Sequence, residues 1–469
     1  MSKRHNDYTV AVIGSGLSGT LVATHLLANP STNPLRVVLT ERHASQFGRG
    51  VAYATNCFKH LLNVPAGRMS AFIEDQEHFL NWANRKALRI HSDTFAPRWV
   101  YGAYLNDVLN EAEASAPKGR QLERVTDEVT AIEVLPRSRG ALIKLRDRKS
   151  LYADRVVFAL GSHAPADPPV DSNTFYTHKR YIRDPWADGA LDHIEPADQV
   201  LLVGTGLTMI DIALGLRHRG HLAPIHAISR HGLLPHTHRH TKLKASFKFL
   251  LQTPITLRGV LHVVRKAGAA AGDQWHTVLD ALRPITQDLW RRLTDDERRR
   301  FLRHVRHYWD IHRHRMAPEI GRQIAELIAV DQLQVHAGRI RDYRPYRKSV
   351  EVVFRERSAA VDRALQVAYV INCTGPDSDI LHSIDPLIKH LRRRGYVRPD
   401  SLALGLDAAE DGALIDASGR RSKIFYTIGP LLKGKLWETT AVPEIRAQAA
   451  ALARSLTVLP KQRRAKAFP

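Results

Sequence analysis

Short apolar runs that end abruptly on glycine recur along the chain. VAVI ends at Gly14 and VLLV ends at Gly204, and each is followed by residues with helical spacing. RVVFAL and VAYVIN lead into further turns at Gly161 and Gly375. A continuous apolar run of ~4–8 residues bounded by a turn is typical of a strand buried on both faces. Such strands alternating with helices predict an α/β fold.

The first of these turns has the full G-x-G-x-x-G spacing. It consists of Gly14, Ser15, Gly16, Leu17, Ser18 and Gly19. Gly14 permits the tight turn, Gly16 lets the backbone approach a pyrophosphate, and Gly19 lets the helix pack close to the strand. Glu41 ends the next predicted strand, LRVVLTE, at about the ~20-residue interval of a carboxylate that binds a ribose hydroxyl. The sequence therefore predicts a Rossmann-like dinucleotide site here.

A second turn of the same kind lies in the middle of the chain. With the start of its helix it consists of Gly204, Thr205, Gly206, Leu207 and Thr208. The third glycine is absent, so we expect looser packing of helix on strand. Asp211 falls in the first turns of that helix, where a carboxylate suits the helix dipole. An ordinary strand-to-helix turn is the alternative to a second dinucleotide site.

The strand that follows this helix ends on basic rather than acidic residues. PIHAIS ends at Ser229, and Arg230 comes next. A Ser-Arg pair at this position suits a 2′-phosphate better than a free ribose hydroxyl. The sequence therefore favours NADP over NAD at the second site.

Three later turns resemble parts of flavoproteins that bind two dinucleotides. ALG at Gly161 and CTG at Gly375 resemble the "ATG"-type turns in which a strand passes close to a bound cofactor. A strand, the turn Gly429–Pro430 and a helix from about Ala441 resemble the segment that closes over the flavin. Pro430 stands where an Asp is common, which puts a carboxylate contact to the ribityl chain in doubt. A plain turn is the alternative at Gly161 and Gly375.

Together these segments resemble a bacterial FAD/NAD(P)-binding flavoprotein family, the YdhS-like proteins. The resemblance rests on GSGLSG, GRGVAY, HLLNVPAGRMSAF, VGTGLTMID, CTGP and TIGPLLKGKLWETTAVPEIR, and it spans nearly the whole chain. This family is similar to flavin-dependent N-hydroxylating and Baeyer–Villiger-type monooxygenases. The resemblance implies two Rossmann-like dinucleotide-binding domains, with FAD on the first glycine motif and NAD(P)H on the second. It implies no particular substrate.

The segment from Gly48 to Phe72 has the small and proline-constrained residues of a loop that can lie flat against a ring system. Arg49 lies in its opening glycine turn. Asn63 can offer a donor and an acceptor to the polar edge of a flavin, and Arg68 could stabilise negative charge on it when reduced. His60, Arg68 and Trp437 are candidates for lining the flavin pocket. A surface loop between two helices is the alternative interpretation.

Between His231 and Glu326 the strand pattern gives way to apolar residues at helical spacing. In the last predicted helix Asp295 is the cap, and Phe301, Val305 and Trp309 form one face. This predicts a mostly helical insertion that shapes the substrate site.

The predicted domains follow from these motifs. The first part of the FAD-binding domain spans 1–195, the NAD(P)-binding domain spans 196–365 with the insertion at about 240–330, and a return segment with a basic tail spans 366–469.

The insertion is rich in basic side chains. Four arginines could bind an anionic substrate: Arg303, Arg306, Arg313 and Arg315. A solvated helix face is the simpler interpretation of the same charges. Histidines group on one helix face and in one loop: His304 and His307, and His236, His238 and His240. Neither group has a committed third or fourth ligand with supporting partners, so we expect no metal site.

Composition limits the remaining choices. The 469 residues carry a formal charge of +22, which favours anionic partners, and nucleic acid stays open on charge although no recognition module accompanies it. Cys57 and Cys373 are too few for a disulfide framework and too far apart for a C-x-x-C pair. We expect the opening residues not to be a secretory signal, and no apolar run approaches the ~20 residues of a membrane span. We expect a cytoplasmic protein with no membrane insertion.

Two dinucleotide sites in one chain indicate hydride transfer from NAD(P)H to FAD. Because the chain has no C-x-x-C dithiol, the electron acceptor of the reduced flavin is oxygen or an organic molecule. We expect oxygenation of a small anionic or amine substrate. A reductase that passes electrons to an organic acceptor and a flavin-containing RNA-binding or RNA-modifying protein are the alternatives. The sequence names no catalytic base.

Overall fold

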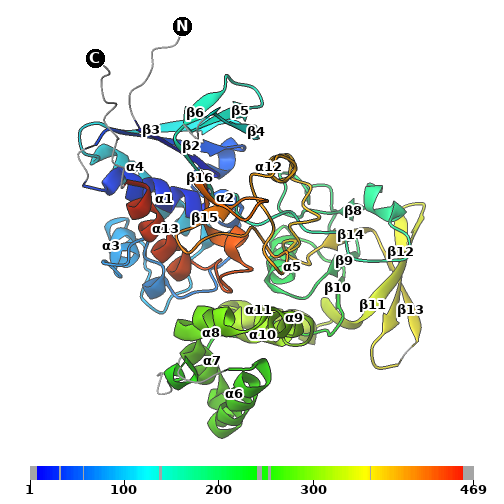
Figure 1. Ribbon diagram of the computed structural model, residues 1–469. Helices are drawn as coiled ribbons and strands as arrows, with labels where there is room; N and C mark the ends of the chain where they lie inside the picture. The colour runs from blue at the N-terminus through cyan, green and yellow to red at the C-terminus, as the bar shows by residue number, and fades with distance from the viewer. Residues whose placement is uncertain are drawn as a thin grey trace, which may run out of the picture.

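The computed structural model describes residues 8–30, 33–55, 57–136, 140–239, 246–251, 255–359 and 361–457. Two lobes, each built on a sheet, lie above a group of helices (Figure 1). The basic tail and His240 lie outside the described residues. No helix within the described ranges is long and apolar enough to cross a membrane.

The first lobe contains a six-stranded sheet in the order β15-β16-β7-β1-β2-β3, parallel except for β15 at one edge. Its strands are β1 Tyr8–Ile13, β2 Leu35–Glu41, β3 Arg120–Thr126, β7 Arg155–Phe158, β15 Ala413–Ile415 and β16 Arg421–Thr427. The helices of this lobe are α1 Leu17–Ala28, α2 Gly50–Tyr53, α3 His78–Arg85, α4 Arg98–Ala114, α12 Pro386–Arg393 and α13 Val442–Thr457. A small antiparallel sheet consists of β4 Val129–Val134, β5 Ala141–Leu145 and β6 Leu151–Ala153.

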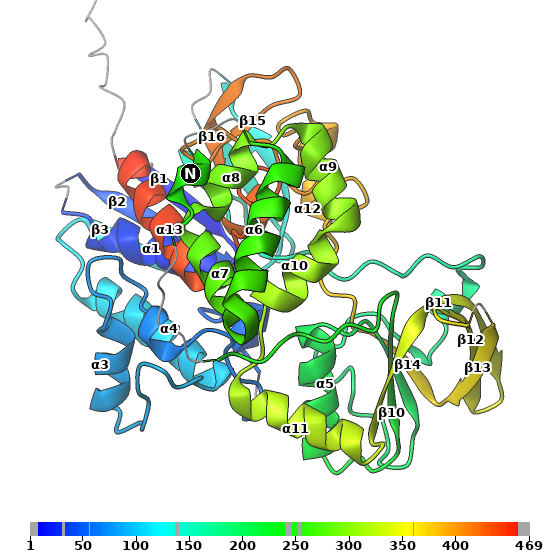
Figure 2. The same ribbon diagram turned by 90° about the horizontal axis from the view of Figure 1, so that it is seen from below.

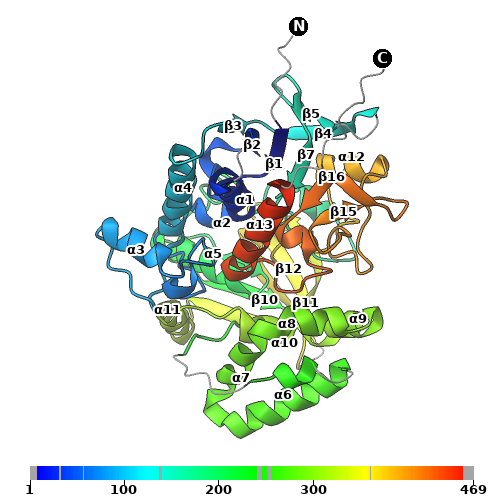
Figure 3. The same ribbon diagram turned by 60° about the vertical axis from the view of Figure 1, so that its left-hand side comes forward.

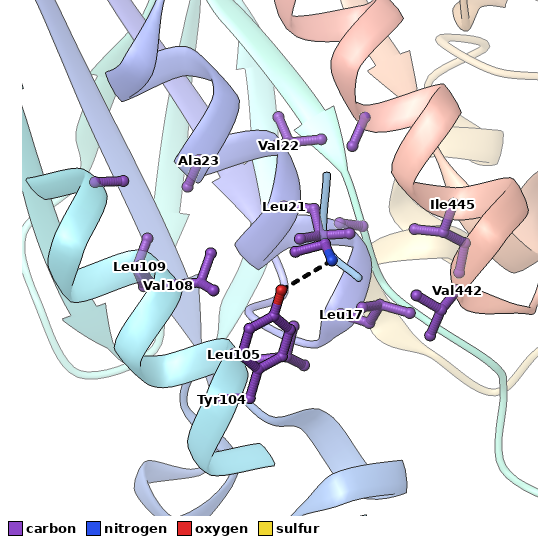
Figure 4. Close-up of a cluster of buried hydrophobic side chains, with 14 of the residues drawn as sticks. Leu17, Leu21, Val22, Ala23, Tyr104, Leu105, Val108, Leu109, Val442 and Ile445 are labelled. Atoms are coloured by element: carbon purple, nitrogen blue, oxygen red, sulfur yellow. Dashed lines mark hydrogen bonds between the residues drawn. The ribbon is translucent and has the colours of Figure 1, made fainter. Parts of the chain in front are cut away.

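Alternate residues of β1 supply two separate cores. Val10 and Val12 pack with α1, α4 and α13, whereas Ala11 and Ile13 pack with the small sheet and α12. A strand buried on both faces needs this continuous apolar run. Figure 3 shows α1 and α13 side by side over the sheet. In the close-up of Figure 4, Leu21 of α1 and Leu105 of α4 meet in this core, and both are fully buried.

The second lobe contains a seven-stranded sheet in the order β13-β12-β11-β10-β9-β14-β8. Its strands are β8 Tyr181–Ile182, β9 Val200–Val203, β10 Ile225–Ser229, β11 Leu333–Tyr346, β12 Ser349–Glu356, β13 Asp362–Val367 and β14 Tyr369–Asn372. The strands from β8 to β11 are parallel, and β11 to β13 form an antiparallel extension at one edge (Figure 2). Helices α5 Leu207–His218 and α11 Pro318–Ala329 pack on one face.

The predicted helical insertion lies between β10 and β11, below both lobes in Figure 1. Its helices are α6 Leu257–Ala271, α7 Trp275–Leu282, α8 Thr286–Arg292, α9 Asp295–His304 and α10 Arg306–Arg313. The α/β fold with two parallel-sheet domains and a helical region is confirmed. The insertion also contacts the first lobe, because Arg283 pairs with Glu444 of α13 at 3.1 Å.

Two details of the insertion differ from the prediction. Thr294, not Asp295, is the N-cap of α9, and its side chain forms a reciprocal capping box with Glu297. A threonine hydroxyl at this position accepts the Glu297 N–H, while Asp295 already lies in the helix. The predicted long helix also breaks at Val305, whose φ of −113° separates α9 from α10.

The chain crosses between the lobes twice. Strand β8 precedes residue 195 and β14 follows residue 365, yet both belong to the second sheet. If domains are defined by sheet membership, one domain boundary falls between β7 and β8 and the other follows β14. The short strands β8 and β14 then belong to the second domain. The glycine turns at the ends of β7 and β14 lie at the crossings.

Candidate functional site

The first glycine loop is a tight junction between β1, α1 and the end of β7. Gly14 has a φ of +97°, and a Cβ atom there would lie 2.4 Å from the carbonyl oxygen of Ala159. A Cβ at Gly19 would lie 1.8 Å from the Gly14 carbonyl oxygen. Gly16 is different, because its Cβ would meet only the Gly50 Cα, at 3.6 Å. Gly14 and Gly19 thus allow close backbone packing, and Gly16 makes only an ordinary contact.

The start of α1 offers backbone donors to an anion. Gly16 is the N-cap and supplies no side-chain cap, and the first turn has no acidic residue. Leu17 and Ser18, which begin the helix, are buried. The uncapped N–H groups and the helix dipole form the electrostatic setting that a pyrophosphate needs.

Glu41 lies against this loop, as the sequence spacing predicts. Its Oε2 accepts hydrogen bonds from the backbone N and the Oγ of Ser15, both at 3.1 Å, and its Oε1 accepts one from Arg42 N at 2.9 Å. The carboxylate is buried. It is therefore fixed at the end of β2, next to the loop, where a ribose hydroxyl could reach it.

The turn from Gly48 to Gly50 packs directly on the glycine loop. Gly48 N donates to Ser15 Oγ at 3.1 Å, and a Cβ at Gly50 would lie 2.8 Å from the Gly16 Cα. Arg49 is half-buried, and its aliphatic stem lies against Gly102 of α4. This turn thus covers one side of the glycine loop at Ser15 and Gly16.

The return segment near the C-terminus reaches the same place. Gly429 has a φ of +78°, and a Cβ there would lie 2.7 Å from Ser18 Oγ, at the start of α1. The carbonyl oxygen of Gly429 accepts from Thr439 Oγ1 at 3.3 Å. Pro430 follows in a one-turn 3₁₀ helix and is half-buried. Residues more than 400 positions apart therefore meet at the first glycine loop.

The loop with Asn63 and Arg68 lies between the lobes. The carbonyl oxygen of Asn63 accepts a hydrogen bond from His238 Nε2 at 2.9 Å, so this loop touches the second domain. Arg68 is exposed at the end of a one-turn 3₁₀ helix. His60 is buried, and its Nε2 donates to the carbonyl oxygen of Asp211 at 3.0 Å. His60 thus joins the domains as a structural contact.

Asp211 has a partner that sequence reasoning missed. Arg98, at the start of α4, forms an ion pair with it at 2.7 Å, across the two lobes. Burial raises the pKa of the Asp211 carboxyl, and Arg98 and His60 oppose that rise. The sequence predicts an interaction between Asp211 and the helix dipole, whereas in the structure its ion pair with Arg98 joins α5 to the first lobe.

The second glycine loop repeats the geometry of the first. Gly204 has a φ of +117°, and a Cβ there would lie 2.4 Å from the Cys373 carbonyl oxygen, while Gly206 has open space around its Cβ position. Thr205 Oγ1 donates to Ser229 Oγ at 2.9 Å. Leu207 and Thr208 begin α5 and are half-buried. Gly206 therefore leaves the uncapped start of α5 approachable.

The turns at Gly161 and Gly375 each lie beside one glycine loop. The strand before Gly161 places Ala159 against Gly14, and the strand before Gly375 places Cys373 against Gly204. Both glycines have positive φ, +70° and +82°, and neither has an atom within 4 Å of its Cβ position. Their surroundings are open in the manner expected where a strand end passes a cofactor.

A basic cluster surrounds the end of β10. Arg230 is exposed there. Ser229 Oγ accepts a hydrogen bond from Gly232 N at 3.0 Å, which stabilises the turn after β10. His231 stacks on His307 of α10 with ring centroids 4.1 Å apart. Burial, with His307, Arg357 and Arg230 nearby, lowers the pKa of His231. Arg357 also contacts His231 Nδ1 and was missed by the sequence reasoning.

A second cluster of charges is buried where the insertion meets the first lobe. Arg313 Nε lies 3.3 Å from Glu438 Oε2, and these side chains are 10% and 4% exposed. Glu438 Oε1 also accepts from Trp309 Nε1 at 2.7 Å. Burial alone would raise the pKa of Glu438, but His314 and Arg313 hold it below its ordinary value.

Arg315 belongs to the same cluster and pairs with Asp280. Its side chain is 3% exposed. Arg313 Nη2 and Arg315 Nη1 are buried with no hydrogen-bond acceptor among the described residues. Burial lowers the pKa of Arg315, Asp280 opposes this shift, and Arg313 and Arg68 add to it. Unsatisfied guanidinium N–H groups in a buried site are donors for an anion.

The other candidates lie elsewhere. Arg303 is exposed on α9, and Arg306 pairs with Asp310 at 3.5 Å. Trp437 is buried and stacked on Trp290 with centroids 4.9 Å apart. Among the described residues, no group of three or more His, Cys, Asp or Glu side chains could hold a metal ion. Burial raises the pKa of the Cys373 thiol, which keeps it protonated.

Comparison with known proteins agrees with this geometry. Residues 11–163 match the model of an FAD-NAD(P)-binding family. The matched segment contains the first glycine loop, Glu41 and the Gly161 turn.

Two curated relatives share part of the sequence. A nitrosuccinic acid synthase from Aspergillus oryzae is 26% identical over 43% of this chain, and an L-aspartate N-monooxygenase (nitrosuccinate-forming) from Streptomyces davaonensis is 28% identical over 44%. The matched regions span 34% and 38% of the lengths of these relatives.

Solved structures share the fold over nearly the whole chain. The reduced form of the ornithine hydroxylase from Pseudomonas aeruginosa superposes with a TM-score of 0.65 at 15% identity, covering 96% of this chain and 98% of that one. The Kutzneria ornithine N-hydroxylase gives 0.62 at 16% identity, covering 96% and 99%. The L-lysine 6-monooxygenase from Pseudomonas syringae gives 0.63 at 16% identity, covering 95% and 98%. These likenesses show the two-domain fold.

Proposed function

We propose that this protein is an FAD-dependent oxidoreductase that takes a hydride from NAD(P)H and uses the reduced flavin with oxygen to N-oxygenate a small amine that carries a carboxylate. The observation that best supports this proposal is the geometry that the two glycine loops share. In each, one glycine packs against a neighbouring strand end, and another precedes a helix start that has no side-chain cap. The Cβ position of Gly206 is open, and that of Gly16 meets only the Gly50 Cα, at 3.6 Å.

The first loop fits FAD. The helix start at Gly16 offers backbone donors to the pyrophosphate, and Glu41 is fixed where it can accept from a ribose hydroxyl. Gly429 and the Gly48 turn enclose this region, and Asn63 and Arg68 lie on the loop that faces the second domain. Bound FAD would supply hydride acceptance and oxygen activation.

The second loop fits the nicotinamide cofactor, and the charges around it support NADP over NAD. Arg230 follows β10, and Arg357, which follows β12, contacts His231, whose ring is stacked on His307. A 2′-phosphate would find charge-assisted donors there, whereas a free hydroxyl would not need them. Arg230→Ala should raise the KM for NADPH at least tenfold and leave that for NADH within about twofold. Equal increases would refute this role for Arg230.

The buried Arg313 and Arg315 support an anionic substrate. Their unpaired N–H groups would bind a carboxylate, and Glu438 and Asp280 hold the two guanidinium groups in place. The Arg313 and Glu438 side chains are 10% and 4% exposed, and low exposure to water strengthens a charge interaction. The two curated relatives are named for reactions of aspartate or formation of nitrosuccinate, which suits an acidic amino acid.

The substrate class is tested by the conservative variant Arg313→Lys, which keeps a positive charge beside Glu438 but removes the planar fork. With purified holoenzyme, NADPH-dependent oxygen uptake and hydroxylamine formation are measured with aspartate, asparagine and cadaverine. We expect turnover of aspartate above the others and a fall in its kcat/KM of about 30-fold or more in the variant, from the loss of a charge-assisted pair worth about 2 kcal/mol. Arg299→Lys, on an exposed site of α9 that lines neither of the two hollows beside α6, is the matched control. A preference for cadaverine would contradict the proposed carboxylate.

The same assay separates oxygenation from simple reduction. A reductase would transfer electrons from NADPH to a quinone or dye, with no amine that increases oxygen uptake. That outcome would leave the two cofactor sites in place and reject the N-oxygenation.

A further inference from the structure

Helix α6 has an apolar face that the protein covers incompletely. None of its 15 residues is buried. Val260, Val263 and Val264 are only partly buried against the apolar cluster of α7 and α8. An amphipathic helix ordinarily buries its apolar stripe in the domain core. The space beneath α6 is therefore larger than its side chains fill.

A cavity of about 550 Å³ occupies this space. Aliphatic side chains of α6, α7 and α8 and the rings of Trp290, Trp309 and Trp437 line it. Its polar side chains include Arg265, His304, Tyr308 and His312. Thr286 is a polar residue on this wall, but its hydroxyl already donates to the Leu282 carbonyl oxygen at 2.9 Å. The volume falls in the ~300–1,000 Å³ range of small-molecule sites, and close-packed interiors do not leave such space.

The cavity opens toward a basic surface. An adjoining hollow of about 810 Å³ shares Leu257, Leu261, Arg265, His304 and Val305 with it. Four arginines line this outer hollow: Arg258, Arg265, Arg300 and Arg303. None of the four forms an ion pair with a carboxylate in the described part of the chain. Unpaired cations at the rim of an apolar cavity complement an anionic head on an apolar chain.

Glu297 is the acidic side chain that lines the outer hollow, and its carboxylate already accepts hydrogen bonds from two backbone N–H groups. Its Oε1 accepts from Leu257 N at 3.0 Å and its Oε2 from Thr294 N at 3.2 Å. Within the described residues Glu297 forms no ion pair with any of the four rim arginines. The positive charge of the rim is therefore available to a ligand.

We propose that the insertion binds a free long-chain carboxylate, with its aliphatic chain beneath α6 against the indoles and its carboxylate at Arg265 and Arg303. No residue of either glycine loop lines this cavity, and the inference does not depend on the proposed oxygenation. Trp437 lines the cavity and precedes Glu438 in the chain, so the occupied cavity adjoins the buried charges.

The test is calorimetric binding of octanoate, decanoate and dodecanoate to the FAD-loaded protein, each below its micelle concentration. Affinity should rise about fourfold for each methylene, which corresponds to about 0.8 kcal/mol. Val264→Trp should abolish binding by filling the cavity, with flavin content and circular dichroism unchanged. Arg265→Gln should weaken dodecanoate at least fivefold and leave dodecanol within twofold. Lys266→Gln, one position further along α6 and outside the cavity lining, should change neither.

Three results would overturn the proposal. One is an affinity that does not depend on chain length, and another is undiminished binding in the folded Val264→Trp protein. The third is binding to phosphatidylglycerol vesicles with none to free dodecanoate, which would assign the basic face to a membrane surface instead.

Discussion

The ion pair between Arg98 and Asp211 fastens the two dinucleotide-binding lobes, so removing one partner should destabilise their joint. Arg98→Met keeps most of the side-chain volume and removes the charge 2.7 Å from the carboxylate. It also removes the hydrogen bond from Arg98 Nε to the Leu61 carbonyl oxygen, at 3.1 Å. The Asp211 side chain is 10% exposed, so the remaining charge would have little water to replace its partner.

The expected cost follows from this burial. Breaking a buried pair on one side typically costs about 3–5 kcal/mol, because an uncompensated charge remains. Burial already raises the pKa of Asp211 with Arg98 present, and Arg98→Met should raise it further. A raised carboxyl pKa gives stability that is present at low pH and lost as the pH rises through that pKa. The deficit of the variant should therefore be small near pH 4 and largest above neutrality.

Urea unfolding followed by circular dichroism at pH 5 and pH 8 measures the effect, with Asp211→Asn and the double variant completing a cycle. We expect a coupling energy of about 2 kcal/mol at pH 8, within the range for residues in direct contact. Arg219→Met, from the exposed pair with Asp192, is the matched control and should cost less than about 0.5 kcal/mol. A loss below 1 kcal/mol in Arg98→Met, or a deficit that grows toward low pH, would refute the reasoning.

Three other changes have clear expected outcomes. Gly19→Ala would force a Cβ to within 1.8 Å of the Gly14 carbonyl oxygen, so the purified variant should lose most of its bound FAD. Gly268→Ala, at a position with open space in α6, should retain its FAD, and equal flavin content in the two variants would contradict the packing argument. Burial lowers the pKa of His238 from 6.5 to about 4, so the unfolded chain binds the proton first as the pH falls. The free energy of unfolding should therefore fall by up to about 3 kcal/mol between pH 6.5 and pH 4. His238→Gln should flatten this pH dependence in urea titrations. Thr294→Ala should cost about 1 kcal/mol in thermal unfolding through loss of the α9 cap, and no change would reject the capping box.

Local motifs made the first half of the candidate site predictable. The strand β1, the loop from Gly14 to Gly19 and the carboxylate of Glu41 lie within about one βαβ unit, and short-range sterics dictate their geometry. The second loop follows the same rule, and β9 and the start of α5 at Leu207 occur where the pattern indicates. Glycine was informative here because positions with positive φ or with close backbone approach need it.

The rest depends on contacts that no local pattern encodes. Glu438 meets Arg313 across 125 positions, and Asp211 meets Arg98 across 113 positions. The sequence indicated Arg313 as one basic residue among many, and burial alone distinguishes it from exposed Arg303. The antiparallel edge formed by β11 to β13 was also not predicted, since its half-exposed strands lack a continuous apolar run.

The central claim is that two cofactor sites in this chain cooperate in oxygen-dependent chemistry on an amine. The most direct measurement is the absorbance spectrum of the purified protein, first with NADPH under argon and then on admission of air with and without aspartate. The account predicts a flavin spectrum bleached by NADPH, and oxygen-dependent recovery coupled to formation of an N-oxygenated product only when the amine is present. A protein that binds no flavin, or whose flavin NADPH never reduces, would contradict it.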